Sequence, residues 1–129
     1  MDCPNCDRPL VAFRVPGELR EYAPDGEFAG ICPDCLRLDS LTEAPTEPDF
    51  GRILDSFPGG EAGRAMALGV GRLVESLALN RDGIATCFEY AADRGADPWL
   101  VVERLATAGS VQPDADLDRA RTQLEQLLD

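Results

Sequence analysis

The spacing of apolar positions changes near residue 49, and this change predicts two kinds of structure. Before that point apolar residues come in short runs, and the longest, Leu10–Val15, predicts a strand. Glu18–Tyr22 is a shorter extended candidate. A Pro-Asp-Gly turn signal at 24–26 precedes a second predicted strand over Glu27–Ile31. We therefore expect a hairpin unit of two or three strands in the N-terminal part.

From residue 49 onward, apolar residues recur every three or four positions, which is the spacing of one face of an α-helix. Capping residues, prolines and glycines divide this part into separate helices. Gly69 and Gly71 are interpreted as points of close helix packing, because the nearby Gly-rich stretch lacks the strand and Lys-Ser/Thr of a phosphate loop. The expected helices cover residues 50–57, 61–79, 82–94, 98–108 and 114–128.

Residues 39–48 are polar and contain prolines, which predicts a connection between the two parts. The predicted fold class is α+β, with a small β unit over residues 1–38 and an α-helical bundle of four or five helices over residues 49–129. A unit of about 38 residues buries too little apolar surface to fold alone. We therefore expect a metal or disulfides to stabilise it.

Two Cys-x-x-Cys pairs in the N-terminal part predict one metal site. Cys3 and Cys6 form the first pair, and Cys32 and Cys35 form the second. Two residues between paired cysteines allow both sulfurs to face one ion, and four thiolates suit a tetrahedral divalent cation. Zinc is the first choice for such a site. Structural zinc can supply on the order of 10 kcal/mol of folding free energy, so we expect metal binding and folding of this unit to be one event.

Residues 3–35, with a proline after the first cysteine of each pair, resemble the zinc ribbons and the related rubredoxin-like knuckle proteins. The resemblance implies a zinc ribbon over residues 1–38 with the four paired cysteines as its metal ligands. In that family a glycine with a left-handed backbone often follows each pair, whereas Asp7 and Leu36 hold these positions here. Asp tolerates that conformation better than Leu does.

Other interpretations of the cysteines stay open. Iron could use the same four sulfurs, and a pair could act as a redox dithiol or form a disulfide. A thioredoxin-like dithiol usually follows a strand, and none is predicted before Cys3. Catalytic zinc generally has His or carboxylate ligands and an open position, and the chain contains no His. The fifth cysteine, Cys87, lies in the apolar stripe of helix 82–94 and is interpreted as a small buried hydrophobe.

The chain carries 24 acidic residues against 12 basic ones, and all 12 are Arg. Acid excess without Lys resembles the protein composition of salt-loving archaea, and an acidic protein from a high-GC bacterium is the alternative. The whole chain also resembles uncharacterised haloarchaeal proteins with an N-terminal zinc ribbon, which implies an organism class and no activity. No basic patch is visible in the sequence, so charge does not support nucleic-acid binding.

The N-terminal residues Met1-Asp2-Cys3 do not resemble a signal peptide, and no apolar run reaches the length of a membrane span. We therefore expect a cytoplasmic protein with no membrane association. In a reducing cytosol, paired cysteines more often bind metal than form structural disulfides.

These features favour a zinc-binding protein-interaction or regulatory module whose partner is another protein. The alternative is a nucleic-acid-associated zinc-ribbon protein with an accessory role in transcription or translation. An enzyme using Glu89, Asp93 or Glu103 in the helical part is the third hypothesis, but no His, Lys or Ser-centred motif completes an acid–base pair. Trp99, directly after Pro98, either closes the end of the helical core or anchors a partner.

Overall fold

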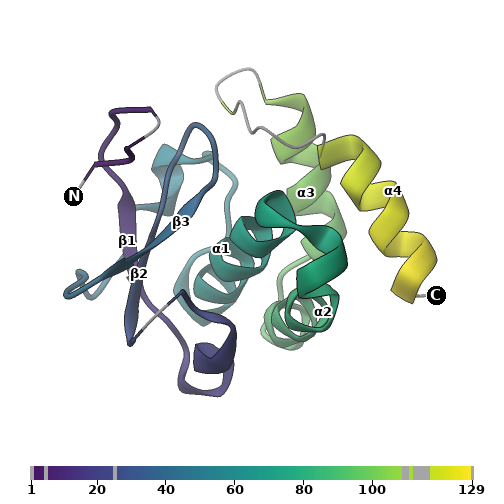
Figure 1. The fold of residues 1–129 in the computed structure, drawn as a ribbon, viewed down its shortest axis with the longest axis horizontal. Coiled ribbons are helices and arrows are strands. Elements are labelled where there is room, and N and C mark those ends of the chain that lie inside the picture. The colour runs from purple at the N-terminus through teal and green to yellow at the C-terminus, as the bar shows by residue number, and fades with distance from the viewer. Residues whose placement is uncertain (1, 5, 25, 109–110, 112–116, 129) are drawn as a thin grey trace.

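The computed structural model describes residues 2–4, 6–24, 26–108, 111 and 117–128. A small antiparallel sheet lies at one end of the molecule and the α-helices lie at the other (Figure 1). Helix α1 lies next to the sheet, and α4 lies farthest from it. The predicted α+β fold class, with an N-terminal β unit followed by helices, is confirmed.

The sheet consists of β1 (Val11–Arg14), β2 (Phe28–Ile31) and β3 (Leu38–Leu41), in the order β1-β2-β3. The first two strands were expected. The third was not, because β3 takes in the first residues of the predicted connection 39–48. A loop between β2 and β3 reverses the chain, so that Leu38 pairs with Ile31 and Leu41 with Phe28. The division into domains 1–38 and 49–129 stays a prediction.

Two short segments form 3-10 helices. Glu18–Tyr22 was expected to be extended, but it lies in η1 (Gly17–Tyr22), in which Leu19 donates its N–H to Pro16. The helical turn directs Leu19 into the core, where it is 1% exposed. The helix expected over 50–57 is reduced to η2 (Phe50–Arg52). The residue of the turn signal at position 25 lies outside the described residues.

Four α-helices follow within the described segments: α1 (Gly60–Glu75), α2 (Leu77–Asp93), α3 (Pro98–Thr107) and α4 (Leu117–Leu128). The helix expected over 61–79 ends early, because Ser76 is extended and its hydroxyl accepts the N–H of Leu79 as a cap for α2. The apolar spacing continues across this break and therefore concealed it. Residues 114–116, the start of the helix expected over 114–128, lie outside the described residues.

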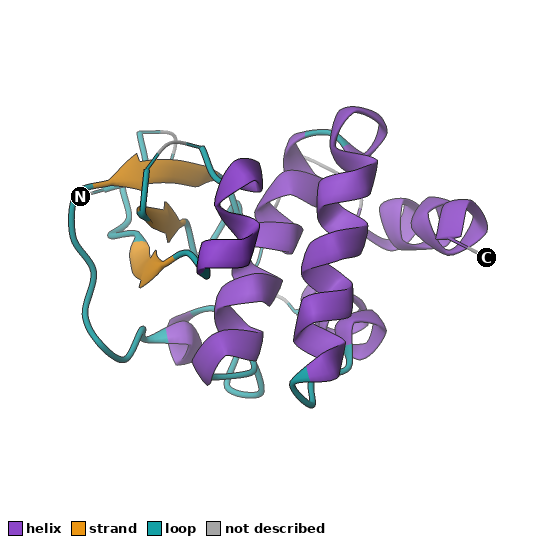
Figure 2. Ribbon diagram, turned by 90° about the horizontal axis from the view of Figure 1, so that it is seen from below, coloured by secondary structure: helices purple, strands orange, loops and turns teal. Residues whose placement is uncertain are grey.

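Helix α1 is the central element, and Figure 2 shows it between the sheet and the remaining helices. Most of its residues are buried, and its glycines allow close approach on two sides. A Cβ at Gly71 would lie 2.2 Å from Cγ of Leu38 in β3, and one at Gly69 would lie 2.8 Å from the ring of Phe88 in α2. The interpretation of both glycines as close-packing positions is confirmed.

One hydrophobic core joins the sheet to the helices. It extends from Phe13 and Ile31 in the sheet through Leu68 of α1 to Ile84 and Leu105 in the following helices. Each helix in the described part of the chain is too short or too polar to cross a lipid bilayer.

Arginines also connect the two parts through backbone carbonyl oxygens. Arg52 donates to the carbonyl of Pro9 at 2.6 Å, and Arg72 of α1 donates to that of Tyr22 at 2.6 Å. A guanidinium has five N–H donors, so one side chain can fix a carbonyl and still reach another group. The N-terminal part is therefore held on the helices by polar contacts as well as by the core.

Candidate metal centre

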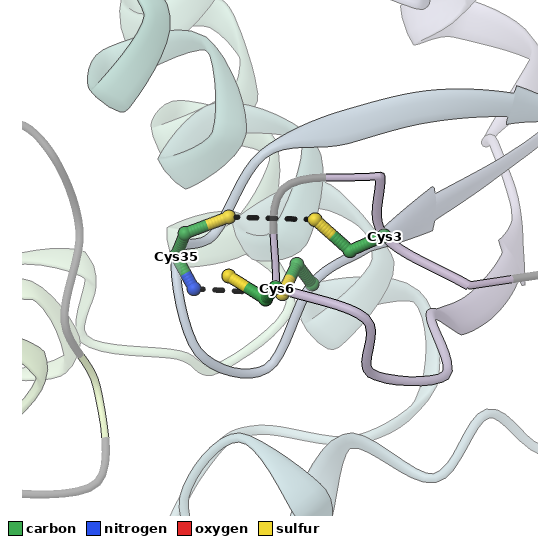
Figure 3. A group of neighbouring side chains, drawn as sticks. Cys3, Cys6 and Cys35 are labelled. Atoms are coloured by element: carbon green, nitrogen blue, oxygen red, sulfur yellow. Dashed lines mark hydrogen bonds between the residues drawn. The ribbon is translucent and has the colours of Figure 1, made fainter.

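The four paired cysteines come together at one point. The first cysteine loop (residues 3–8) precedes β1, and the second cysteine loop (residues 32–37) connects β2 to β3. The four sulfurs all lie within 4.8 Å of one another. Figure 3 shows Cys3, Cys6 and Cys35 directed toward a common centre. The sheet therefore positions the two loops face to face, as the cysteine spacing predicts.

The geometry fits a tetrahedral metal ion. The sulfurs of Cys3 and Cys35 are 3.8 Å apart, and metal–sulfur bonds of about 2.3 Å give a tetrahedron with edges of about 3.8 Å. These four cysteines are not joined by disulfide bonds. Cys3, Cys32 and Cys35 are buried, and Cys6 is half-buried at the side nearest solvent. The donor set is therefore that of a closed, thiolate-only site.

The two cysteine loops have the same backbone hydrogen bonds. The N–H of Cys3 donates to the carbonyl of Arg8 at 2.8 Å, and the N–H of Cys32 donates to that of Arg37 at 3.0 Å. Both loops carry the pattern Cys-Pro-x-Cys-x-Arg, over residues 3–8 and 32–37. Our sequence reasoning missed this six-residue repeat, although comparing the two segments side by side would have revealed it.

The residue after each pair has a left-handed backbone, as the resemblance to zinc ribbons implies. The φ angle is 57° at Asp7 and 65° at Leu36. Asp7 donates its N–H to the carbonyl of Cys3 at 2.8 Å, and Leu36 does the same to Cys32 at 2.9 Å. A left-handed conformation costs a residue with a Cβ about 1–2 kcal/mol. The fold thus accepts strain in both loops to complete the same turn.

Leu36 shows how the strain is offset. Its side chain is fully buried and belongs to the main hydrophobic core, whereas the cysteines form a separate small cluster with Leu10 and Leu41. Burying a Leu side chain is worth about 1.5–3 kcal/mol, which matches or exceeds the conformational cost. The second cysteine loop is therefore fixed to the core by the residue directly after a candidate ligand.

Polar groups around the sulfurs favour a bound cation. The N–H groups of Asp34 and Cys35 point at the sulfur of Cys32, at 3.4 and 3.5 Å. Burial raises the pKa of the Cys35 thiol above its ordinary value, so without a cation this thiol keeps its proton at neutral pH. Binding a metal there therefore releases protons.

A partly exposed ion pair also joins the two loops: Arg8 and Asp34 lie 3.8 Å apart.

The other candidate residues lie apart from this centre. Cys87 is fully buried in the core, where burial raises its pKa to about 12, and its interpretation as a small buried hydrophobe is confirmed. The proposed catalytic carboxylates are all exposed: Glu89, Asp93 and Glu103. Trp99 is half-buried and meets Phe88 edge-on, with ring centroids 6.0 Å apart, which favours the core-closing interpretation.

One protein-family model matches nearly the whole chain. A model of a family of unknown function (DUF6276) matches residues 2–128, which include both cysteine loops and all four α-helices. No curated protein and no solved structure matches the chain significantly. The four-cysteine cluster is therefore the feature from which function can be argued. By the extent of this match, the chain belongs to the family of unknown function DUF6276.

Proposed function

We propose that the protein is a zinc-dependent interaction or regulatory module, in which a structural zinc ion makes the N-terminal unit a rigid platform on the helices. The observation that carries this proposal is the closed four-cysteine cluster whose second loop inserts Leu36 into the main core. A metal at this position would fix both loops and, through Leu36, the sheet-facing side of α1. Platform and helical core would then fold together.

Zinc is proposed over iron because a closed site fixed to the core serves a structural purpose. Zinc has no redox chemistry and forms tetrahedral thiolate sites without an open position. Iron accepts the same four sulfurs, and the site would then be rubredoxin-like. In this proposal zinc contributes charge and coordination bonds only, and the chain's own residues hold the fold that a partner recognises.

A protein partner is proposed rather than nucleic acid because of charge. The formal net charge is -12, so most of the surface repels phosphate backbones. The carboxylates that could serve an enzyme are exposed: Glu89 and Asp93 lie on α2, and Glu103 lies on α3. An interaction role is therefore the simplest function for a zinc-fixed platform.

The proposal is tested by affinity capture with matched cysteine variants. Full-length protein, Cys6→Ser and Cys87→Ser would each capture partners from native lysate at native salt, with protein and nucleic acid both identified. We expect a defined protein partner that binds the wild type and Cys87→Ser but not Cys6→Ser, because Cys6 is a candidate ligand and Cys87 lies in the core. Capture of nucleic acid, or a partner that also binds Cys6→Ser, would contradict the proposal.

A further inference from the structure

A second candidate site lies at the junction of β1, η1 and α1. It is a hollow of about 400 Å³ lined by Arg14, Arg20, Arg64 and Glu61, together with residues 15–17 between β1 and η1. This volume falls within the range of small-molecule sites. None of the candidate metal ligands lines it. The hollow is therefore a separate feature of the fold.

The hollow concentrates positive charge in an acidic protein. Glu27 pairs with both Arg14 and Arg20, at 2.6 and 3.3 Å, so one carboxylate serves two guanidinium groups. Neither of these arginines is therefore fully neutralised. Over the whole chain, by contrast, acidic residues outnumber arginines two to one.

The side of the hollow formed by α1 also has more positive than negative charge. Glu61 pairs with Arg94 at 3.0 Å and accepts the hydroxyl of Tyr90, and Glu18 also faces Arg94. Arg64 donates to the carbonyl of Thr46 at 2.7 Å, a neutral partner that leaves its charge in place. Among the described residues named here, four arginines stand against three glutamates, an excess of one positive charge.

Arginine is also the side chain best suited to a tetrahedral oxyanion. Its planar fork donates two parallel hydrogen bonds, and several forks around one hollow can share the oxygens of a phosphate. Arg64 is fixed in the second turn of α1, which begins at Gly60. We infer that the hollow lined by Arg14, Arg20 and Arg64 binds a small molecule that carries a phosphate group.

A small ligand fits the charge distribution better than a nucleic-acid strand does. A polymer needs cations spread along a track, whereas this hollow is a local exception on a chain of net charge -12. Glu27 occupies two of the arginines in the absence of ligand, so a phosphate would compete with it. This competition predicts that removing the Glu27 carboxylate tightens phosphate binding, whereas removing an arginine of the hollow weakens it.

The test measures binding of inorganic phosphate and of adenosine monophosphate to the metal-loaded full chain, by calorimetry at constant ionic strength. We expect Arg64→Gln to weaken binding about tenfold, which corresponds to losing a charge-assisted hydrogen bond. Glu27→Gln should tighten it about threefold by releasing Arg14 and Arg20. Arg104→Gln, which removes an exposed charge on α3, should leave binding unchanged.

The ligand series separates the two sources of a phosphate group. Tighter binding of the nucleotide would identify a phosphate ester as the ligand class, and equal binding would identify free phosphate. The inference is overturned if wild-type protein shows no saturable binding, or if Glu27→Gln binds more weakly than wild type. It is also overturned if Arg64→Gln and Arg104→Gln weaken the binding of phosphate or nucleotide equally, since that result indicates general charge and not the hollow. The Glu27 variant keeps the test decisive even if Arg64→Gln unfolds.

Discussion

Asp7 and Leu36 occupy equivalent positions in the two cysteine loops, with φ angles of 57° and 65°, yet Asp7 is exposed and Leu36 is fully buried. The same turn thus faces solvent in the first loop and the protein core in the second. Glycine would satisfy the backbone at both positions. At position 36, a large apolar residue makes the backbone hydrogen bond of the turn and also fills space in the hydrophobic core.

Substitutions at Leu36 should separate the cost of its left-handed backbone from the stabilisation that its buried side chain provides. Leu36→Ala should lower the free energy of unfolding by about 2–5 kcal/mol, since it leaves a cavity and keeps the strain. Leu36→Gly should be no worse than Leu36→Ala, because relief of the left-handed strain offsets the extra lost methyl group and backbone entropy. Chemical denaturation of both variants measures the difference.

Leu68 provides the matched control, because it is fully buried but lies in the middle of α1. There Gly should be less stable than Ala by about 1–2 kcal/mol, from lost helix propensity and lost burial. A similar penalty for Gly at both positions would show that Leu36 carries no conformational strain.

Close packing of α1 on the sheet predicts a severe effect of one methyl group. Gly71→Ala should lower the free energy of unfolding by about 1–3 kcal/mol or more, because the new Cβ would overlap Leu38 of β3. Gly17→Ala is the control, since a Cβ there has no neighbour within 4 Å. Thermal melts should leave the control unchanged or slightly more stable. Equal stability of the two variants would contradict the described contact between β3 and α1.

The buried thiol of Cys87 predicts a pH dependence with a definite sign. Burial raises its pKa in the folded protein to about 12, against about 8.5 in an unfolded chain. Its contribution to stability is therefore complete below pH of about 8.5 and is lost as pH rises toward the folded value. The stability advantage of the wild type over Cys87→Ala should shrink over this alkaline range. An advantage that stays constant or grows from pH 8 to pH 11 would contradict the assignment of Cys87 as a buried neutral thiol.

Salt should stabilise the protein. A formal net charge of -12 on 129 residues creates self-repulsion in the compact state. Added salt screens this repulsion over a distance of about 3 Å at 1 M, so the unfolding temperature should rise as KCl increases from dilute to molar. Melts across a KCl series measure this effect, and a flat or falling curve would contradict the expected role of charge repulsion in the stability of this chain.

Local signals predicted local features well. Asp97 and Pro98 indicate the start of a helix, and the side chain of Asp97 does accept the N–H of Leu100 as a cap for α3. The cysteine spacing likewise predicts the gathering of four sulfurs, because two short loops suffice to form the cluster. In both cases the relevant chemistry is contained in a few neighbouring residues.

Features that depend on distant contacts were missed. β3 includes Asp39 and Ser40, whose polarity indicates a loop, and it forms because β2 offers an edge to which it can pair. The start of α2 at Leu77 is concealed because the apolar spacing of α1 continues past Ser76. The burial of Leu36 depends on the main core that joins the sheet to the helices, and the cysteine motif does not contain that core.

The central claim is that the four cysteines hold one structural zinc ion, and metal analysis of purified, reduced full-length protein tests it most directly. We predict roughly one zinc per chain in the wild type and in Cys87→Ser, and a much lower content in Cys6→Ser, which removes one of the four thiolates. Zinc content near zero in folded, reduced wild-type protein, or a red sample loaded with iron, would contradict the claim.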